Sequence, residues 1–126
     1  MGILRDKIEG PLANEGTELH RYFCMYKRAL MSVRSNGTTF SKEPGGEWRM
    51  RFSRKPECTL EDWTEHKRTT IAKLQSWQFV ADLPAIADLD RWMIDGVAES
   101  LSGDTVEPDG IGPDGAPSWL LALGIL

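Results

Sequence analysis

The sequence has few residues for covalent cross-links. Its two cysteines, Cys24 and Cys58, form no CxxC or CxxxC pair, so we expect two free thiols in a reducing compartment. No run of 18 or more apolar residues is present, so the sequence predicts no transmembrane helix. Arg5, Asp6 and Lys7 lie where a signal peptide needs an apolar stretch. These absences predict a cytoplasmic protein with no membrane partner.

Catalytic signatures are missing as well. With only two histidines and no GxSxG, HExxH or P-loop pattern, no nucleophile has an evident base. The letters GxGxxG occur at 110–115, but no strand is expected before them and Pro113 removes a backbone amide. The acidic residues nearby lack the spacing of an EF-hand. We therefore expect a non-enzymatic protein without a cofactor.

A zinc site is a weaker alternative. His20 and Cys24 are four residues apart and would point the same way on a helix, while Cys58 and His66 would complete a Cys₂His₂ set. A core cysteine and surface histidines are the simpler interpretation. A small metal-dependent or thiol enzyme, the third functional hypothesis, depends on these four residues.

What the sequence does contain is a core and a divided charge. Of its 126 residues 40% are hydrophobic, with five Trp, so the chain can bury an interior. Residues 1–75 hold 14 of the 15 Lys and Arg against 10 acids, a balance of +4. Residues 76–126 hold Arg91 alone against 9 acids, a balance of −8. This division suggests an interaction surface, or two surfaces that meet within one fold.

The first long helix is expected to begin at Thr17 and to end at Asn36-Gly37. Its apolar residues recur at spacings of three and four, which is typical of one buried helix face. They are Leu19, Tyr22, Phe23, Tyr26, Leu30 and Val33. Basic residues would occupy the far side of this helix.

Residues 38–53 predict a β-hairpin with its turn at Pro44-Gly45-Gly46. Strict alternation over 47–53 places Trp48, Met50 and Phe52 on one face, and Arg49 and Arg51 on the other.

Two more helices are expected, one from Thr59 to about Val80 and one from Pro84 to Gly103. Residues 103–117 form an acidic Pro/Gly-rich linker that leads to an apolar C-terminal segment, a short helix. The predicted fold is α+β and helix-dominated: helix, one β-hairpin, helix, helix and short C-terminal helix. Residues 1–126 are expected to form a single domain.

The favoured function is a protein-interaction module, a small regulator or inhibitor that binds a larger macromolecular partner or self-associates into an oligomer. The alternative is a DNA- or RNA-binding regulator that contacts phosphates with its arginines. Trp92 beside Arg91, together with Trp119, could serve as exposed interface anchors. The basic candidates are Arg49, Arg51, Arg54 and Lys55 on the hairpin, and Arg21, Lys27, Arg28 and Arg34 on the first helix.

Overall fold

The computed structural model describes residues 15–126, and in this part of the chain strands outweigh helices. A four-stranded antiparallel sheet has the order β1-β2-β3-β4, and a second sheet pairs β5 with β6. The elements are β1 (Glu18–Cys24), β2 (Ala29–Arg34), β3 (Thr38–Lys42), β4 (Arg49–Ser53), α2 (Leu60–Ile71), η2 (Ser76–Gln78), α3 (Ile86–Asp95), β5 (Ala98–Glu99), β6 (Thr105–Val106) and α4 (Trp119–Ala122). The prediction of a helix-dominated fold is therefore wrong.

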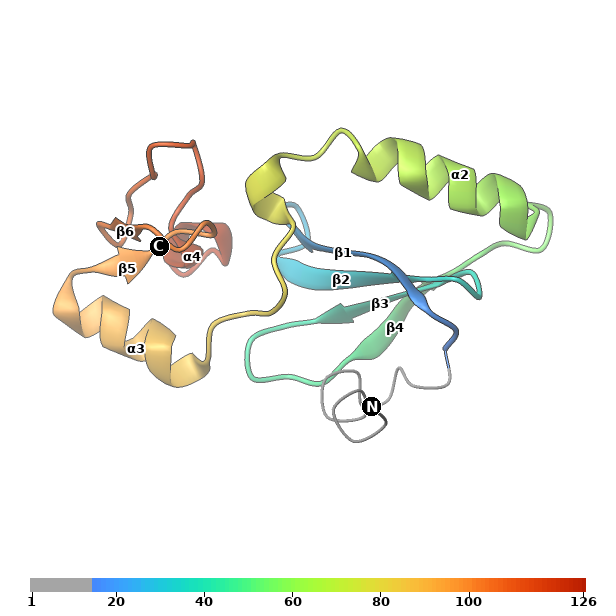
Figure 1. Cartoon of the computed structure of the whole chain (residues 1–126). Helices are drawn as coiled ribbons and strands as arrows, with labels where there is room; N and C mark the ends of the chain where they lie inside the picture. The colour runs from blue at the N-terminus through green and yellow to red at the C-terminus, as the bar shows by residue number, and fades with distance from the viewer. Residues whose placement is uncertain (1–14) are drawn as a thin grey trace.

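The segment expected as the first long helix forms β1, a tight turn at 25–28, and β2 (Figure 1). All six residues of β2 are buried, so this strand is covered on both of its faces. A strand buried on both faces lacks the apolar/polar alternation that marks a half-buried strand. The apolar residues that recur every three or four positions therefore belong to two paired strands and to both faces of the sheet. In this pairing Phe23 lies opposite Leu30, and Tyr22 lies opposite Met31.

The hairpin expected within 38–53 is present as β3 and β4. Two more hairpins, β1–β2 and β2–β3, precede it, so the prediction of a single hairpin is wrong. Asn36-Gly37 was expected to end a helix and instead joins β2 to β3. Gly37 has a φ of +91° there, a conformation that glycine adopts at little steric cost.

The helices that follow are shorter than expected. Thr59 caps α2 as predicted, since its hydroxyl accepts a hydrogen bond from the backbone N–H of Asp62 at 3.1 Å. Helix α2 ends at Ile71, and the chain then turns into η2. Helix α3 ends at Gly96, whose φ is +70°, and not at Gly103. The residues after Gly96 form the β5–β6 pair.

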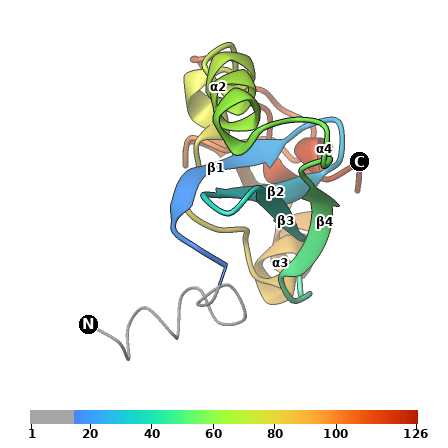
Figure 2. The ribbon, with the colours of Figure 1, turned by 90° about the vertical axis from the view of Figure 1, so that its right-hand side faces the viewer.

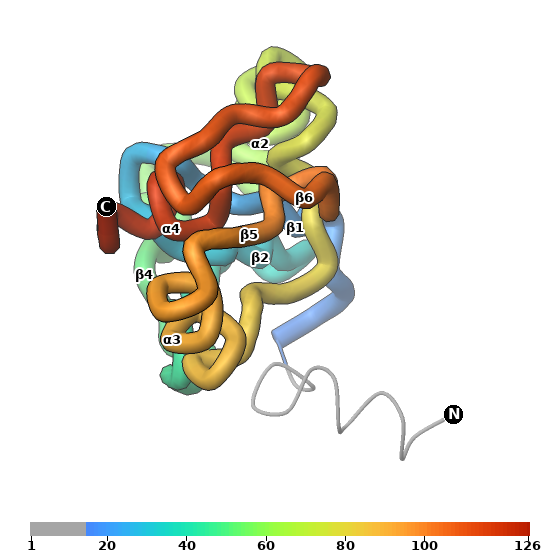
Figure 3. The backbone as a smooth tube through the Cα atoms, turned by 90° about the vertical axis from the view of Figure 1, so that its left-hand side faces the viewer, coloured from blue at the N-terminus to red at the C-terminus, as the bar shows by residue number. Residues whose placement is uncertain are grey.

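Helix α2 lies along one face of the four-stranded sheet, and the C-terminal half of the chain gathers at one end of it (Figure 1). Figure 3 shows α3, β5, β6 and α4 from that end. A buried apolar cluster joins this half to the sheet. Its members are Phe23, Leu89, Trp92, Ala98, Leu101, Ala116, Trp119, Leu120 and Ala122. The ring of Phe23, from β1, meets the ring of Trp119 edge to face, with centroids 5.2 Å apart.

Hydrogen bonds hold the segment 103–117, which was expected as a linker. The N–H of Ser118 donates to the carbonyl oxygen of Gly110 at 2.9 Å. The Asp114 carboxylate accepts hydrogen bonds from the Ser102 hydroxyl and from the N–H of Ala116. The segment therefore has a defined conformation, while the single-domain division of the chain stays a prediction.

The short C-terminal helix is present as α4. The hydroxyl of Ser118 caps it by accepting a hydrogen bond from the N–H of Leu121 at 3.1 Å. Trp119 and Leu120 are buried, whereas residues 125–126 remain about half exposed. The apolar end of the chain thus packs mainly against its own core.

Phe23→Ala is expected to lower the free energy of unfolding by about 3–5 kcal/mol, because a fully buried ring is replaced by a cavity. Urea unfolding followed by tryptophan fluorescence measures the change. Tyr26→Ala is the matched control from the same hairpin: Tyr26 is 92% exposed, so its removal should change stability by less than about 0.5 kcal/mol. Similar losses in the two variants would contradict the role of Phe23.

The hydrogen bonds from Ser102 and Ala116 lower the pKa of Asp114 from its ordinary value of 3.8. A carboxyl with a depressed pKa in the folded state adds stability above its unfolded-state pKa, and this stability disappears as the pH falls through the folded-state pKa. An NMR titration should therefore give Asp114 a pKa below 3.8, and Ser102→Ala should raise it. A wild-type pKa at or above 3.8 would refute this arrangement of the segment.

Candidate functional site

Strand β4 is an edge of the four-stranded sheet (Figure 2). All five of its residues are exposed. Met50 is 55% exposed and Phe52 is 45% exposed, although both are large apolar side chains. Arg49 and Arg51 alternate with them along the strand. An exposed edge strand offers both unpaired main-chain groups and side chains to a partner.

A β-bulge changes which face these side chains occupy. Met50 lies opposite Phe40 in β3, and Phe52 lies opposite Thr39, so Arg51 is the extra residue. Because Thr39 and Phe40 point to opposite faces, Met50 and Phe52 do so as well. The prediction that strict alternation places both on one face with Trp48 is wrong.

The 25–28 turn lies beside β4 and adds to its surface. Tyr26 is 92% exposed, and the ammonium nitrogen of Lys27 lies 5.9 Å from the Tyr26 ring centroid and 5.0 Å from that of Phe52. These are cation–π contacts that join the turn to the strand. We call the combined area the β4–turn surface; it consists of Tyr26, Lys27, Arg49, Met50, Arg51 and Phe52.

The basic residues of the hairpin differ in how far they are engaged. The guanidinium of Arg49 lies 3.5 Å from the Glu43 carboxylate, an exposed pair that contributes little. Arg54 donates hydrogen bonds to the carbonyl oxygens of Lys55 and Cys58, which ties it to the loop before α2. Among residues 15–126, neither Arg51 nor Lys55 has an ion-pair partner, and both are exposed.

The expected stripe on a first helix does not exist as one surface. Arg21 donates to Glu18 at 2.9 Å and to the carbonyl oxygen of Ala81 at 2.8 Å, and it lies over the Trp48 ring. Arg28 packs against Gly124, near the end of the chain. Only Lys27 of this set lies on the β4–turn surface.

Arg34 is completely buried. Its guanidinium lies 3.7 Å from the Glu18 carboxylate and donates hydrogen bonds to the carbonyl oxygens of Glu15 and Gly16, at 3.2 and 2.9 Å. It also lies 3.3 Å from the Ser32 hydroxyl. Arg34 therefore holds the start of β1 against β2 and does not face solvent.

The remaining expected partner residues, which are Arg91, Trp92 and Trp119, do not belong to the β4–turn surface. Trp92 and Trp119, expected as exposed anchors, are 7% and 6% exposed and belong to the core. Leu89 and Trp92 together form the buried face of α3. Arg91 is paired with Asp88 of the same helix at 3.0 Å.

The four candidate zinc ligands do not come together in one site. His20 and Cys24 are on β1, where four residues span about 13 Å, while Cys58 precedes α2 and His66 lies on it. Burial lowers the pKa of His20 from its ordinary value. No three His, Cys, Asp or Glu side chains within residues 15–126 form a group that could hold a metal ion.

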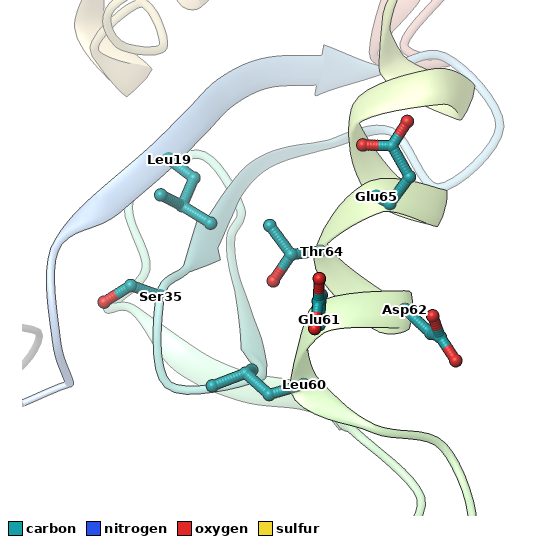
Figure 4. A pocket seen from close by; sticks show the side chains of 7 residues that line it. All are labelled: Leu19, Ser35, Leu60, Glu61, Asp62, Thr64 and Glu65. Carbon is teal, nitrogen blue, oxygen red and sulfur yellow. The ribbon is translucent and has the colours of Figure 1, made fainter.

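A groove of about 800 Å³ lies between β1 and the first half of α2 (Figure 4). Leu19 and Leu60 provide apolar walls, and Glu61, Asp62 and Glu65 form an acidic rim. Two of these acids stand in the first turn of α2, where negative charge stabilises the helix dipole. Arg68 neutralises Glu65 at 2.5 Å and lowers its pKa. Helix stability thus explains most of this rim without a ligand.

The chain matches no protein-family model, no curated protein and no solved structure. Within residues 15–126, none of the helices is both long and apolar enough to cross a membrane. The β4–turn surface is the feature of the described residues that best fits an interaction with another molecule.

Arg34→Met should lower the free energy of unfolding by about 2–3 kcal/mol. This loss is smaller than that for a fully buried pair because Glu18 keeps its ion pair with Arg21. Arg51→Met is the matched control and should change stability by less than about 0.5 kcal/mol, since Arg51 is exposed. Chemical denaturation measures both variants. An Arg34→Met protein as stable as wild type would contradict the structural assignment.

Proposed function

We propose that the chain is a non-enzymatic protein-interaction module, a small regulator or inhibitor, that binds an acidic protein partner through the β4–turn surface. The observation that carries the proposal is an edge strand whose five residues are all exposed and whose first four alternate between basic and apolar. Surface strands that serve only the fold normally present polar residues to solvent. Exposed Met50 and Phe52 are better explained as contacts for another molecule.

The composition of the surface favours a protein partner. Aromatic residues, Met and Arg are enriched at protein interfaces, and five of the six residues of the β4–turn surface belong to these types. Tyr26 is a rigid side chain at the tip of a tight turn, the type of residue that anchors an interface. The cations at Lys27, Arg49 and Arg51 favour an acidic partner, because opposite charges speed association and exclude basic competitors.

A selection of short random peptides against the full chain tests the proposal. Peptides rich in Asp and Glu are expected to be enriched. Their affinity should fall at least about tenfold in Arg49→Glu/Arg51→Glu, a loss of about 1.4 kcal/mol, because attraction becomes repulsion. Fluorescence polarisation with the enriched peptides measures the change.

Arg68→Glu/Lys73→Glu is the matched control, because it makes the same change of net charge at exposed residues away from the surface. It should retain most of the affinity. Enrichment of basic peptides, or the same loss of affinity in both double variants, would contradict the proposed site.

A nucleic-acid partner is the second candidate function. Its support is the arrangement of Lys27 between the exposed rings of Tyr26 and Phe52, since bases stack on aromatic rings and phosphates bind cations. Labelled single-stranded and duplex DNA and RNA should then bind at low salt, with an affinity that falls steeply as salt rises. Absence of binding at low salt would remove this candidate.

A further inference from the structure

We propose that β4 accepts an extended acidic segment of a partner protein as a fifth strand of the sheet. This inference rests on the proposed function and specifies how the same surface binds. Main-chain hydrogen bonds would supply affinity, and alternate side chains would supply specificity, as in other cases of strand addition.

The hydrogen bonding of the hairpin leaves part of the β4 main chain free. Thr38 pairs with Ser53, and the N–H of Arg54 donates to the carbonyl oxygen of Gly37 at 2.8 Å. In an antiparallel ladder, hydrogen-bonded and non-hydrogen-bonded pairs alternate, so Thr38 and Ser53 form a non-hydrogen-bonded pair. The N–H and C=O of Ser53 therefore point away from β3, toward the open side of the sheet.

The two edges of the sheet differ in this respect. On β1, the carbonyl oxygen of Phe23 accepts a hydrogen bond from the Gln78 amide at 3.1 Å. On β4, the main chain makes no hydrogen bond outside the β3–β4 ladder to any residue of the described part, 15–126. Of the two edges, β4 is therefore the one whose main chain has no partner outside its ladder in that part.

The charges on β4 select the occupant. If two copies paired through β4 in antiparallel fashion about Arg51, the two Arg51 side chains would meet. Pairing about Met50 would place Arg49 opposite Arg51. Like charges directly opposite one another destabilise a strand pair, which disfavours a second copy in these two registers. Carboxylates at alternate positions of an incoming strand would instead face the arginines, with apolar residues beside Met50 or Phe52.

Amide hydrogen exchange on the full ¹⁵N-labelled chain tests strand addition directly. The probe is a short peptide of alternating Glu and Val, added to saturation at low salt. The amide of Ser53 should exchange at least about tenfold more slowly in the complex, because it would be hydrogen-bonded to the probe. The neighbouring amide of Arg54 is the internal control, since it already donates to Gly37 and should change less.

A pair of variants provides a second readout. Ser53→Pro removes the outward N–H and keeps the ladder bonds to β3, a substitution that edge strands tolerate. Its affinity for the probe should fall at least about tenfold, whereas Ser53→Ala should bind as wild type does. If Ser53→Pro does not fold, the exchange of Ser53 in the wild-type chain decides the question.

Each other outcome overturns the inference. A bound probe that leaves Ser53 exchange unchanged would show contact through side chains alone, and the proposed function would stand. Failure of the probe to bind refutes acidic strand addition, while the peptide selection separately decides the proposed function. Protection of Ser53 that rises with chain concentration in the absence of probe would assign the edge to a second copy. Protection by DNA alone would assign it to nucleic acid.

Discussion

Burial of the Phe23 side chain, which extends from β1 into the core of the C-terminal half, holds the two halves of the chain together. The side chain leaves the sheet and packs edge to face on Trp119, while the Phe23 carbonyl oxygen accepts a hydrogen bond from Gln78. Separating the halves would expose the aromatic pair and leave a buried amide without its acceptor. The Gln78 contact also occupies a main-chain acceptor of the β1 edge, whereas all five residues of β4 stay exposed. Docking of the C-terminal half thus engages the β1 edge at Phe23 and leaves β4 exposed.

Burial also decides which arginines are available to a partner. Arg34 lies inside the fold because Glu18 and two backbone carbonyls compensate its charge, and Arg21 is held by Glu18 and Ala81. A buried cation without such partners would be too costly to fold. Of the basic residues expected to form two stripes, Arg49 and Arg51 of β4 remain exposed, since no other element within residues 15–126 covers them. Part of the positive charge of residues 1–75 is therefore compensated inside the fold, and part of it is exposed to solvent.

The sequence predicts a hairpin of this structure where the turn contains typical turn residues, and fails where the turn lacks them. Pro44-Gly45-Gly46 and the alternation after it predict the β3–β4 hairpin correctly. The β1–β2 turn contains no Gly, Pro or Asn, and Arg28 adopts a φ of +55° there, so no local pattern marks it. The basic residues of β4 could be predicted as a surface, but the bulge at Arg51 and the exposure of Tyr26 depend on strand pairing, which the local sequence does not encode.

An exposed edge strand is a hazard, because its free N–H and C=O groups can pair with other chains. Strand β4 has two of the usual protective features, a bulge and charged side chains. Protection alone would be served better by polar residues at the positions of Met50 and Phe52, which are instead large, apolar and about half exposed. Like charges disfavour pairing with a second copy in the registers that bring the arginines together, whereas the exposed apolar side chains favour contact with a partner of opposite charge. The arginines that disfavour pairing of the chain with itself therefore also favour an acidic partner.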